Sequence, residues 1–233
     1  MIVSKQNQQF KLWKKLKTKK YRDLHGQFLV YGEHLIEAAK KTGHLEMVIT
    51  SNPNKEGMLI AAELMEELQQ TETLIDTIGL CKKVIVPKTS KRILALDQVQ
   101  DPDNVGALLR SAAAFGFEHV ILSHHSADLY NEKTIRASKG AIFHCYVERG
   151  PLGEKLKDLK TKNYQIIGAD AHQGEAILKP DKIVLVLGNE GQGISSEIKA
   201  LCDTFVTIET NTVESLNVSV AGGILMYEWS VRK

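Results

Sequence analysis

The sequence predicts an α/β fold with two domains, a small amino-terminal α/β domain followed by a larger domain with a mostly parallel sheet. From residue 93 onward, short apolar runs alternate with amphipathic helical patterns, which is typical of parallel strands covered by helices on both faces. The first 87 residues hold a smaller mixed set of strands and helices, and the polar, proline-containing segment 87–92 is typical of a linker. We therefore expect domains at residues 1–88 and 89–233.

Composition narrows the class of protein. The 233 residues are 43% hydrophobic and 25% charged, the balance of a globular chain that can bury a core. No run approaches the roughly 20 apolar residues of a membrane span, and the start lacks the apolar stretch of a signal peptide, so we expect a cytoplasmic protein without a membrane partner. Cys81, Cys145 and Cys202 are widely spaced and odd in number, which favours buried small side chains over a disulfide framework or a metal site.

Basic residues are unevenly distributed, although the formal net charge is only +2. Eight lysines and arginines lie between Lys5 and Arg22, with no acidic residue among them. Such a run either contacts a phosphate backbone or forms the solvated face of a helix, and the segment alone does not decide between the two.

The periodicity of the apolar residues predicts the elements in order. In the first domain, residues 28–41 predict a strand, a glycine turn and a helix, followed by a strand at 45–51, a helix at 57–70 and a strand at 82–87. The second domain has predicted strands at 93–99, 119–123, 142–148, 164–170, 182–188 and 204–209, and predicted helices at 104–116, 131–140, 153–162, directly after Gly193 and within 212–229. Ligands of such sheets collect at the carboxyl ends of the strands, which makes the loops there the candidate site.

The first of these loops is "DPDN" at residues 101–104, which supplies turn and N-cap chemistry before a helix. Asn104 by itself reads as a cap. Arg110 lies nearly two turns further along the helix, among small residues that favour close packing. A packed arginine needs an anionic partner or a functional reason, so Arg110 is a candidate site residue.

The second loop, "LGNEGQGIS" at residues 187–195, follows five apolar residues that predict a buried strand. Its glycines permit positive φ and allow a ligand to approach the backbone. The loop lacks the lysine and hydroxyl of a phosphate-binding P-loop and the spacing of a dinucleotide fingerprint. Glu190 in its middle would repel a phosphate, so a neutral or cationic ligand fits better.

The third loop leads into "TVESLNVSVAGGILMYEW", an amphipathic helix with polar residues at its entrance. Ser215 is explained as an N-cap, but a plain core helix does not account for Asn217 and Ser219. Gly222 and Gly223 together cost about 2 kcal/mol relative to alanine if both are helical. Close approach of another backbone, from a partner subunit or a ligand-binding loop, would offset that cost.

Together the three loops resemble the motifs of the SpoU/TrmH family of RNA ribose 2′-O-methyltransferases, in the SPOUT superfamily. "NVGALLR" matches the family's N-x-G-x-x-x-R motif, "LVLGNEGQGIS" its second motif and "VESLNVSVAGGILMYE" its third. "ASKGAIFH" resembles the S-x-G-A region between the first two motifs. The amino-terminal "KYRDLHGQFLVYGEHLIEAAKK" is similar to the small RNA-binding domain of many members, so the resemblance covers nearly the whole chain.

The resemblance implies a trefoil knot in the carboxyl-terminal domain, a homodimer formed through that domain, and S-adenosylmethionine as methyl donor with no metal. It implies that Gly188, Ile208 and Leu216 contact the cofactor. The catalytic residues that it implies are Arg110, Asn104, Glu190, Ser215 and Asn217. Because an arginine with a pKa above ~12 is a poor general base, we expect Arg110 to grip the RNA phosphate and hydroxyl while the phosphate or solvent takes the proton.

The expected substrate is structured RNA, with ribosomal RNA of the 23S type favoured over transfer RNA and DNA excluded because it lacks the 2′-hydroxyl. Two positions depart from the family pattern: Glu209-Thr210 replaces a Pro-Met pair, and Tyr31 stands where related proteins often have glutamate. Two alternatives stay open, a catalytically silent RNA-binding scaffold and a SPOUT methyltransferase that acts on a base nitrogen.

Overall fold

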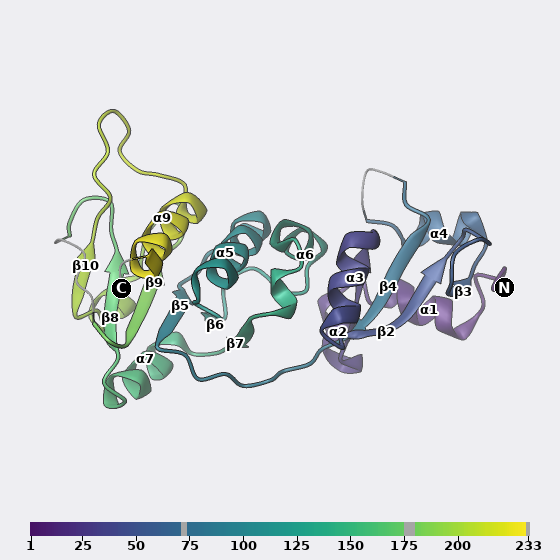
Figure 1. Ribbon diagram of the computed structural model, residues 1–233, viewed down its shortest axis with the longest axis horizontal. Helices are drawn as coiled ribbons and strands as arrows, with labels where there is room; N and C mark the ends of the chain where they lie inside the picture. Colours follow the sequence, from purple (N-terminus) through teal and green to yellow (C-terminus); the bar gives the residue numbers. More distant parts are fainter. Residues whose placement is uncertain (71–73, 175–179, 232–233) are drawn as a thin grey trace.

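The computed structural model describes residues 1–70, 74–174 and 180–231. It has a two-part α/β architecture, with the amino-terminal part at one end of an elongated molecule and a larger part at the other (Figure 1). The elements of the first part are α1 (Gln8–Lys15), α2 (Lys19–His25), β1 (Gln27–Tyr31), α3 (Glu33–Lys41), β2 (Leu45–Thr50), β3 (Met58–Leu59), α4 (Ala62–Leu68) and β4 (Thr77–Lys82).

The amino-terminal sheet has the strand order β1-β4-β2-β3, with β4 antiparallel to both of its neighbours. Its core contains Phe10 and Trp13 of α1, which are almost completely buried. The basic run at residues 5–22 therefore contributes to helices α1 and α2, of which α1 buries Phe10 and Trp13 and α2 buries Arg22. Two of its lysines, Lys5 and Lys14, pair with Glu67 of α4.

Two elements of this part differ from the sequence prediction. The last strand is β4 at Thr77–Lys82, whereas a strand was predicted at 82–87. The apolar residues Ile85 and Val86 are 65% and 60% exposed, so their pattern did not reflect burial, and residues 83–90 connect the two parts without regular structure. The predicted helix at 57–70 divides into strand β3 and the shorter helix α4.

The larger part contains a six-stranded sheet of order β10-β8-β9-β5-β6-β7, in which every described pairing is parallel. This confirms the predicted mostly parallel sheet. Its elements are β5 (Arg92–Leu96), α5 (Pro102–Phe115), β6 (His119–Leu122), α6 (Glu132–Ser138), the 3₁₀ turn η1 (Ala141–Phe143), β7 (Tyr146–Arg149), α7 (Leu152–Thr161), β8 (Gln165–Ala169), β9 (Ile183–Leu187), α8 (Ser196–Lys199), β10 (Thr204–Val206) and α9 (Val218–Val231).

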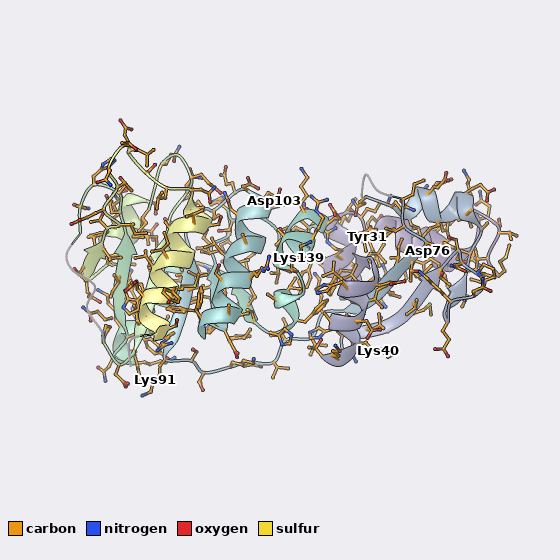
Figure 2. All side chains as sticks on the ribbon, turned by 45° about the horizontal axis from the view of Figure 1, so that its top comes forward. Tyr31, Lys40, Asp76, Lys91, Asp103 and Lys139 are labelled. Atoms are coloured by element: carbon orange, nitrogen blue, oxygen red, sulfur yellow. The ribbon has the colours of Figure 1, made fainter. Side chains whose placement is uncertain are left out.

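Alternate residues of the central strands face two separate cores. Leu94 and Leu185 belong to the cluster that includes side chains of α5, α6 and α9, whereas Ile93 and Val184 belong to the cluster under α7 and α8. The carboxyl ends of the strands share one edge: Lys91, just before β5, and Asp103, in the first turn of the following helix α5, lie at opposite edges of the molecule (Figure 2). The long connection between β10 and α9 rises from the same carboxyl edge (Figure 1).

The two parts share buried contacts. The cluster under α5 and α6 continues into β1 and α3, and the Phe28 and Tyr130 rings lie 4.6 Å apart between centroids. Arg22 of α2 is paired with Asp128 of the larger part, with 2.5 Å between Nη2 and Oδ2. Gly140 meets α3 so closely that a Cβ there would lie 3.0 Å from the Cβ of Ala38.

The three cysteines are free thiols. Cys81 is fully buried, as predicted, while Cys145 and Cys202 are half-buried. Burial raises the pKa of Cys81 and Cys145 to about 12 and that of Cys202 to about 11, so these thiols stay protonated at neutral pH. Within the described residues, no helix has the length and apolar content needed to cross a membrane.

Candidate functional site

A pocket of about 290 Å³ opens at the carboxyl edge of the parallel sheet. Three segments that are far apart in the sequence line it: residues 169–172 after β8, residues 187–193 after β9, and residues between Val206 and Leu225 that connect β10 to α9. Each segment follows a neighbouring strand, which is why the topology brings them together. The position agrees with the site expected from the loops at the strand ends.

The residues predicted to bind the cofactor all line this pocket. Gly188, Ile208 and Leu216 are among its lining residues, as is Ser215. The apolar share of the wall comes from the ends of strands β8, β9 and β10 and from α9, with Ala169, Leu187, Val206, Val218, Ala221 and Leu225. Thr210, at the departure from Pro-Met, also lines the pocket, and its hydroxyl donates to the carbonyl of Val213 at 2.6 Å.

The loop after β9 closes on itself. The backbone N–H of Asn189 donates to the carbonyl of Gly193 and the reverse bond also forms, both at 2.9 Å. A Cβ on Gly188 would lie 2.2 Å from backbone atoms of Gly193 and Ile194, so only glycine fits there. Gly193 has φ +69°, which also favours glycine. Glycine at both positions thus shapes the wall of the pocket before any ligand enters.

Glu190 is held by donors from the loop before α5. Its carboxylate accepts from the backbone N–H of Gln100 at 3.3 Å and of Asp101 at 3.2 Å, and from the Asn104 side chain at 3.0 Å. Burial alone would raise the pKa of Glu190, but the hydrogen bonds from Asn104 and the backbone outweigh it and lower the pKa. Glu190 is therefore a fixed negative charge at the pocket wall at neutral pH.

Asn217, Asn104 and Glu190 form a chain of hydrogen bonds that runs in one direction, which we call the relay. The Asn217 amide donates to the Asn104 oxygen at 3.1 Å, and Asn104 in turn donates to Glu190. Asn217 accepts from both the backbone N–H and the hydroxyl of Ser219, at 2.8 and 2.6 Å. Each amide must therefore point one way, and the relay joins the three loops singled out in the sequence.

The entrance of α9 is capped by Asn217. The helix begins at Val218, so Ser215 is not its N-cap, contrary to one interpretation of the sequence. Ser215 instead lines the pocket, and the Asn217 oxygen occupies the capping position toward Ser219. At this entrance Asn217 and Ser219 therefore form the cap, Asn217 also belongs to the relay, and Ser215 belongs to the pocket wall.

Arg110 lies apart from this relay. Its side chain on α5 is exposed and is absent from the pocket lining, so the expectation of close packing around this arginine is wrong for the single chain. Among the residues that the structure describes, no hydrogen bond or ion pair engages its guanidinium. Gly106, one of the small neighbours, has another explanation: a Cβ on it would lie 2.5 Å from Thr134 and Ala137 of α6, so it serves the α5–α6 contact.

The two glycines of α9 differ in their surroundings. A Cβ on Gly222 would lie 2.4 Å from Leu108 of α5 and 2.6 Å from Leu187 of β9. A Cβ on Gly223 would make only an ordinary contact, 3.4 Å from the Ser111 hydroxyl. Close packing inside the chain therefore accounts for Gly222 but not for Gly223.

Sequence reasoning missed three residues that support the relay. Asn189 donates to the carbonyl of Gln98 at 2.9 Å, and Gln98 has φ 59°, unusual for a residue other than glycine. Asp97, only 3% exposed, accepts from the backbone N–H of Ser195 at 2.8 Å and ties the end of the loop to β5. The signal for Asp97 was available, since an acidic residue directly follows the apolar run "ILAL".

The chemistry that this arrangement favours is binding of a neutral or cationic ligand in a pocket with both apolar and polar walls, next to a fixed carboxylate and two oriented amides. In the described part of the chain, no three His, Cys, Asp or Glu residues come together in a group that could hold a metal ion.

Comparison with known proteins agrees with the fold and with the motifs. The SpoU rRNA Methylase family matches residues 91–227, and the MRM3-like substrate binding domain matches residues 7–92. The 23S rRNA (guanosine(2553)-2′-O)-methyltransferase RlmP of Bacillus subtilis (strain 168) is 32% identical over 244 aligned residues, which cover 97% of each chain.

Solved structures show the same architecture over nearly the full chain. An RNA methyltransferase structure of the TrmH family from Porphyromonas gingivalis has a TM-score of 0.84 at 29% identity and covers 97% of this chain and 98% of its own. The SpoU methyltransferase AviRb from Streptomyces viridochromogenes, in complex with the cofactor AdoMet, has a TM-score of 0.85 over 97% of both chains; at 24% identity this likeness supports the fold alone. The motifs, the matched families and the full-length relative show that this chain belongs to the SpoU rRNA methylase family.

Proposed function

We propose that this protein transfers a methyl group from S-adenosylmethionine to a ribose 2′-hydroxyl of RNA. The observation that carries the proposal is the relay from Asn217 through Asn104 to Glu190, which joins three separate loops beside the pocket. The 2′-O-methyltransferase activity named for the B. subtilis relative supports it.

The pocket suits S-adenosylmethionine. Its volume of about 290 Å³ lies near the lower end of small-ligand sites, its walls combine apolar and polar groups, and the fixed charge of Glu190 tolerates a sulfonium nearby. When bound, the cofactor supplies an electrophilic methyl group. We assign cofactor binding to Gly188, Ile208 and Leu216, through backbone groups and apolar surface.

We propose that the relay orients the ribose of the substrate. Asn104 and Asn217 are fixed in direction and Glu190 is fixed in charge, so none needs to reorganise when RNA binds. Ser215 lies in the pocket wall, where its hydroxyl can meet the ribose. Positioning of the hydroxyl in line with the methyl group accounts for much of the rate in such a reaction.

Arg110 is assigned to the RNA. Its exposed guanidinium is free for a bidentate contact with a phosphate, and it holds the nearby hydroxyl while the phosphate or solvent accepts the proton. Because the arginine itself stays protonated, its role is electrostatic and geometric.

We assign RNA binding to residues 1–88 and methyl transfer to residues 89–233. The match of residues 7–92 to a substrate binding domain supports this division, and the basic residues between Lys5 and Arg22 would add salt-dependent affinity. Ribosomal RNA is favoured over transfer RNA, and the cytoplasm is the expected location. Tyr31, at the departure from glutamate, packs inside the amino-terminal part: its hydroxyl bonds to Gln70 at 3.0 Å, and burial raises its pKa.

We also propose a homodimer formed through α9 and a trefoil knot in the segment that carries the pocket. Val220, Ile224 and Tyr227 are 50%, 40% and 48% exposed at helical spacing, an apolar stripe that a second copy would cover. The knot is supported by the convergence of the three loops and by the family resemblance.

The test is transfer of a labelled methyl group from S-adenosylmethionine to total RNA from cells that lack this gene, followed by mapping of the modified nucleotide. We expect label in a ribose for the wild type, loss of at least 100-fold in Arg110→Ala, and no transfer to DNA. Lys162→Ala removes an exposed cation at the opposite edge of the sheet and serves as the control. A folded protein that leaves RNA unlabelled, or labels a base, contradicts the proposal.

A further inference from the structure

Two acidic side chains besides Glu190 line the pocket, the exposed Glu214 and the more buried Asp170. Asp170 follows β8 directly, and its side chain is 11% exposed. Its backbone N–H donates to the carbonyl of Val206 at 3.0 Å, which fixes the residue against β10. Neither the relay nor Arg110 involves the Asp170 carboxylate, so the mechanism proposed above gives Asp170 no role.

The Asp170 carboxylate is held ionised and in one orientation. One oxygen accepts from the Lys199 ammonium at 2.9 Å, and the other accepts from the backbone N–H of His172 at 3.0 Å. Burial alone would raise the pKa of Asp170, but these hydrogen bonds outweigh it and hold the pKa below its ordinary value. A carboxylate has about four acceptor sites, so acceptor capacity remains for a ligand.

Sheet order places Asp170 at the end of the pocket away from the relay. Asn104 follows β5, Glu190 follows β9 and Asp170 follows β8, and these strands are consecutive neighbours in the sheet. Adjacent strands lie about 4.8 Å apart, so Asp170 is roughly two strands from Asn104. The methyl group must face the relay and the RNA, so the adenosine portion of the cofactor extends toward β8 and β10.

We propose that the Asp170 carboxylate accepts hydrogen bonds from the ribose hydroxyls of S-adenosylmethionine and so determines specificity for the cofactor. The inference rests on the proposed methyl donor. An acidic side chain that binds ribose hydroxyls is an established solution at the carboxyl edge of parallel sheets. Lys199 acts as a positioning residue, because its ion pair keeps the carboxylate turned into the pocket wall.

The test is calorimetric binding of S-adenosylhomocysteine and of its 2′-deoxy and 3′-deoxy analogues to the full-length protein. The wild type is expected to bind at least one deoxy analogue about tenfold more weakly than the parent ligand, because a hydrogen bond to a charged acceptor is lost. Asp170→Asn is expected to bind the parent ligand about tenfold more weakly and to discriminate little against that analogue. Asp158→Asn, which breaks an exposed ion pair with Lys162, is the control and should behave as the wild type.

Two further measurements separate the outcomes. S-inosylhomocysteine lacks the adenine amino group; if Asp170→Asn abolishes discrimination against it and leaves the deoxy effect intact, the carboxylate binds the base and the proposal is overturned. Lys199→Gln keeps the carboxylate and should retain discrimination against the deoxy analogue.

If the wild type binds S-adenosylhomocysteine and binds both deoxy analogues equally well, only the role of Asp170 fails. If the wild type does not bind S-adenosylhomocysteine at all, the proposed methyl donor fails as well.

Discussion

The side-chain amide of Asn217 donates to the side-chain oxygen of Asn104 across 3.1 Å, although the two residues are 113 positions apart in the chain. This bond links the entrance of α9 to the first turn of α5. Since Asn104 has only one amide group and donates it to Glu190, the two bonds fix which way each side chain faces. The site is therefore organised in the absence of RNA.

Asn104→Asp tests the relay most directly. An aspartate can still accept from Asn217, but it removes the donor to Glu190 and places a second carboxylate beside it. We expect the pKa of Glu190 to rise and methyl transfer to fall by about 10-fold to 100-fold, because the ribose loses its fixed neighbours. Titration of the labelled Glu190 carboxyl carbon by NMR, together with activity measured against pH, checks both effects.

Asn104→Asp should also change how the stability of the folded protein depends on pH. Glu190 has a lowered pKa in the folded protein, so its stabilising contribution is present above its ordinary pKa of 4.5 and is lost as the pH falls through the lowered value. In Asn104→Asp the folded-state pKa of Glu190 lies closer to its ordinary value, so the stability lost on acidification should be smaller and the loss should be complete at a higher pH. Asn131→Asp is the matched control, because aspartate caps α6 as well as asparagine does, and within the part of the chain that the structure describes the Asn131 side chain accepts from the backbone N–H of Lys133 and bonds to no carboxylate. An unshifted Glu190 titration in Asn104→Asp would refute the relay.

Gly222→Ala and Gly223→Ala should have opposite effects on stability. The added methyl at 222 meets Leu108 and Leu187, both nearly fully buried, so overpacking should cost about 1–3 kcal/mol of unfolding free energy. The methyl at 223 makes an ordinary contact and should add up to about 1 kcal/mol through helix propensity. Urea denaturation of the two variants measures the difference, and equal effects would contradict the packing described for α9.

Much of this architecture could be predicted because burial leaves a direct mark on the sequence. Strands β6 and β9 are buried at every position and β5 is buried at every position after Arg92, so they appear as largely apolar runs, and the loops after β5 and β9 were found by their turn residues. The partners of Asn104, Asn217 and Gly222 could not be predicted, because they depend on which distant segments the sheet order brings together.

The sequence predictions that were wrong also have physical causes. Residues 82–87 contain three consecutive apolar residues, as a strand can, yet the strand that pairs with both β1 and β2 is Thr77–Lys82. For Arg110, small neighbours were taken as a sign that the arginine is enclosed, whereas Gly106 serves the contact with α6 and the arginine faces solvent. A helix has more than one face, and composition near a residue does not tell which face it occupies.

The pair between Arg22 and Asp128 should stabilise the junction of the two parts. Arg22 is 7% exposed at its side chain and also donates to the carbonyls of Leu16 and Lys17. Asp128→Ala leaves this buried cation without its partner and should cost about 3–5 kcal/mol of unfolding free energy. A double-mutant cycle with Arg22→Met should give a coupling of about 1–3 kcal/mol by chemical denaturation.

The exposed pair between Lys91 and Asp181 offers a matched control for that cycle, since its N···O distance is also short, at 2.7 Å. Both side chains are more than two-thirds solvent-exposed, so little coupling is expected there. Equal coupling in the two cycles would mean that burial of Arg22 does not strengthen the junction.

The apolar stripe on α9 predicts how the proposed dimer can be dissociated. Ile224 lies at the centre of the stripe, so Ile224→Asp would bury a charge in the interface and should yield monomers at micromolar concentrations in analytical ultracentrifugation. Leu24→Asp changes an equally apolar residue that is 69% exposed on α2, and it should remain a dimer. Unchanged circular dichroism and melting of Ile224→Asp would separate dissociation from unfolding. A wild-type protein that sediments as a monomer, or an Ile224→Asp variant that stays dimeric, would remove α9 as the contact between the two copies.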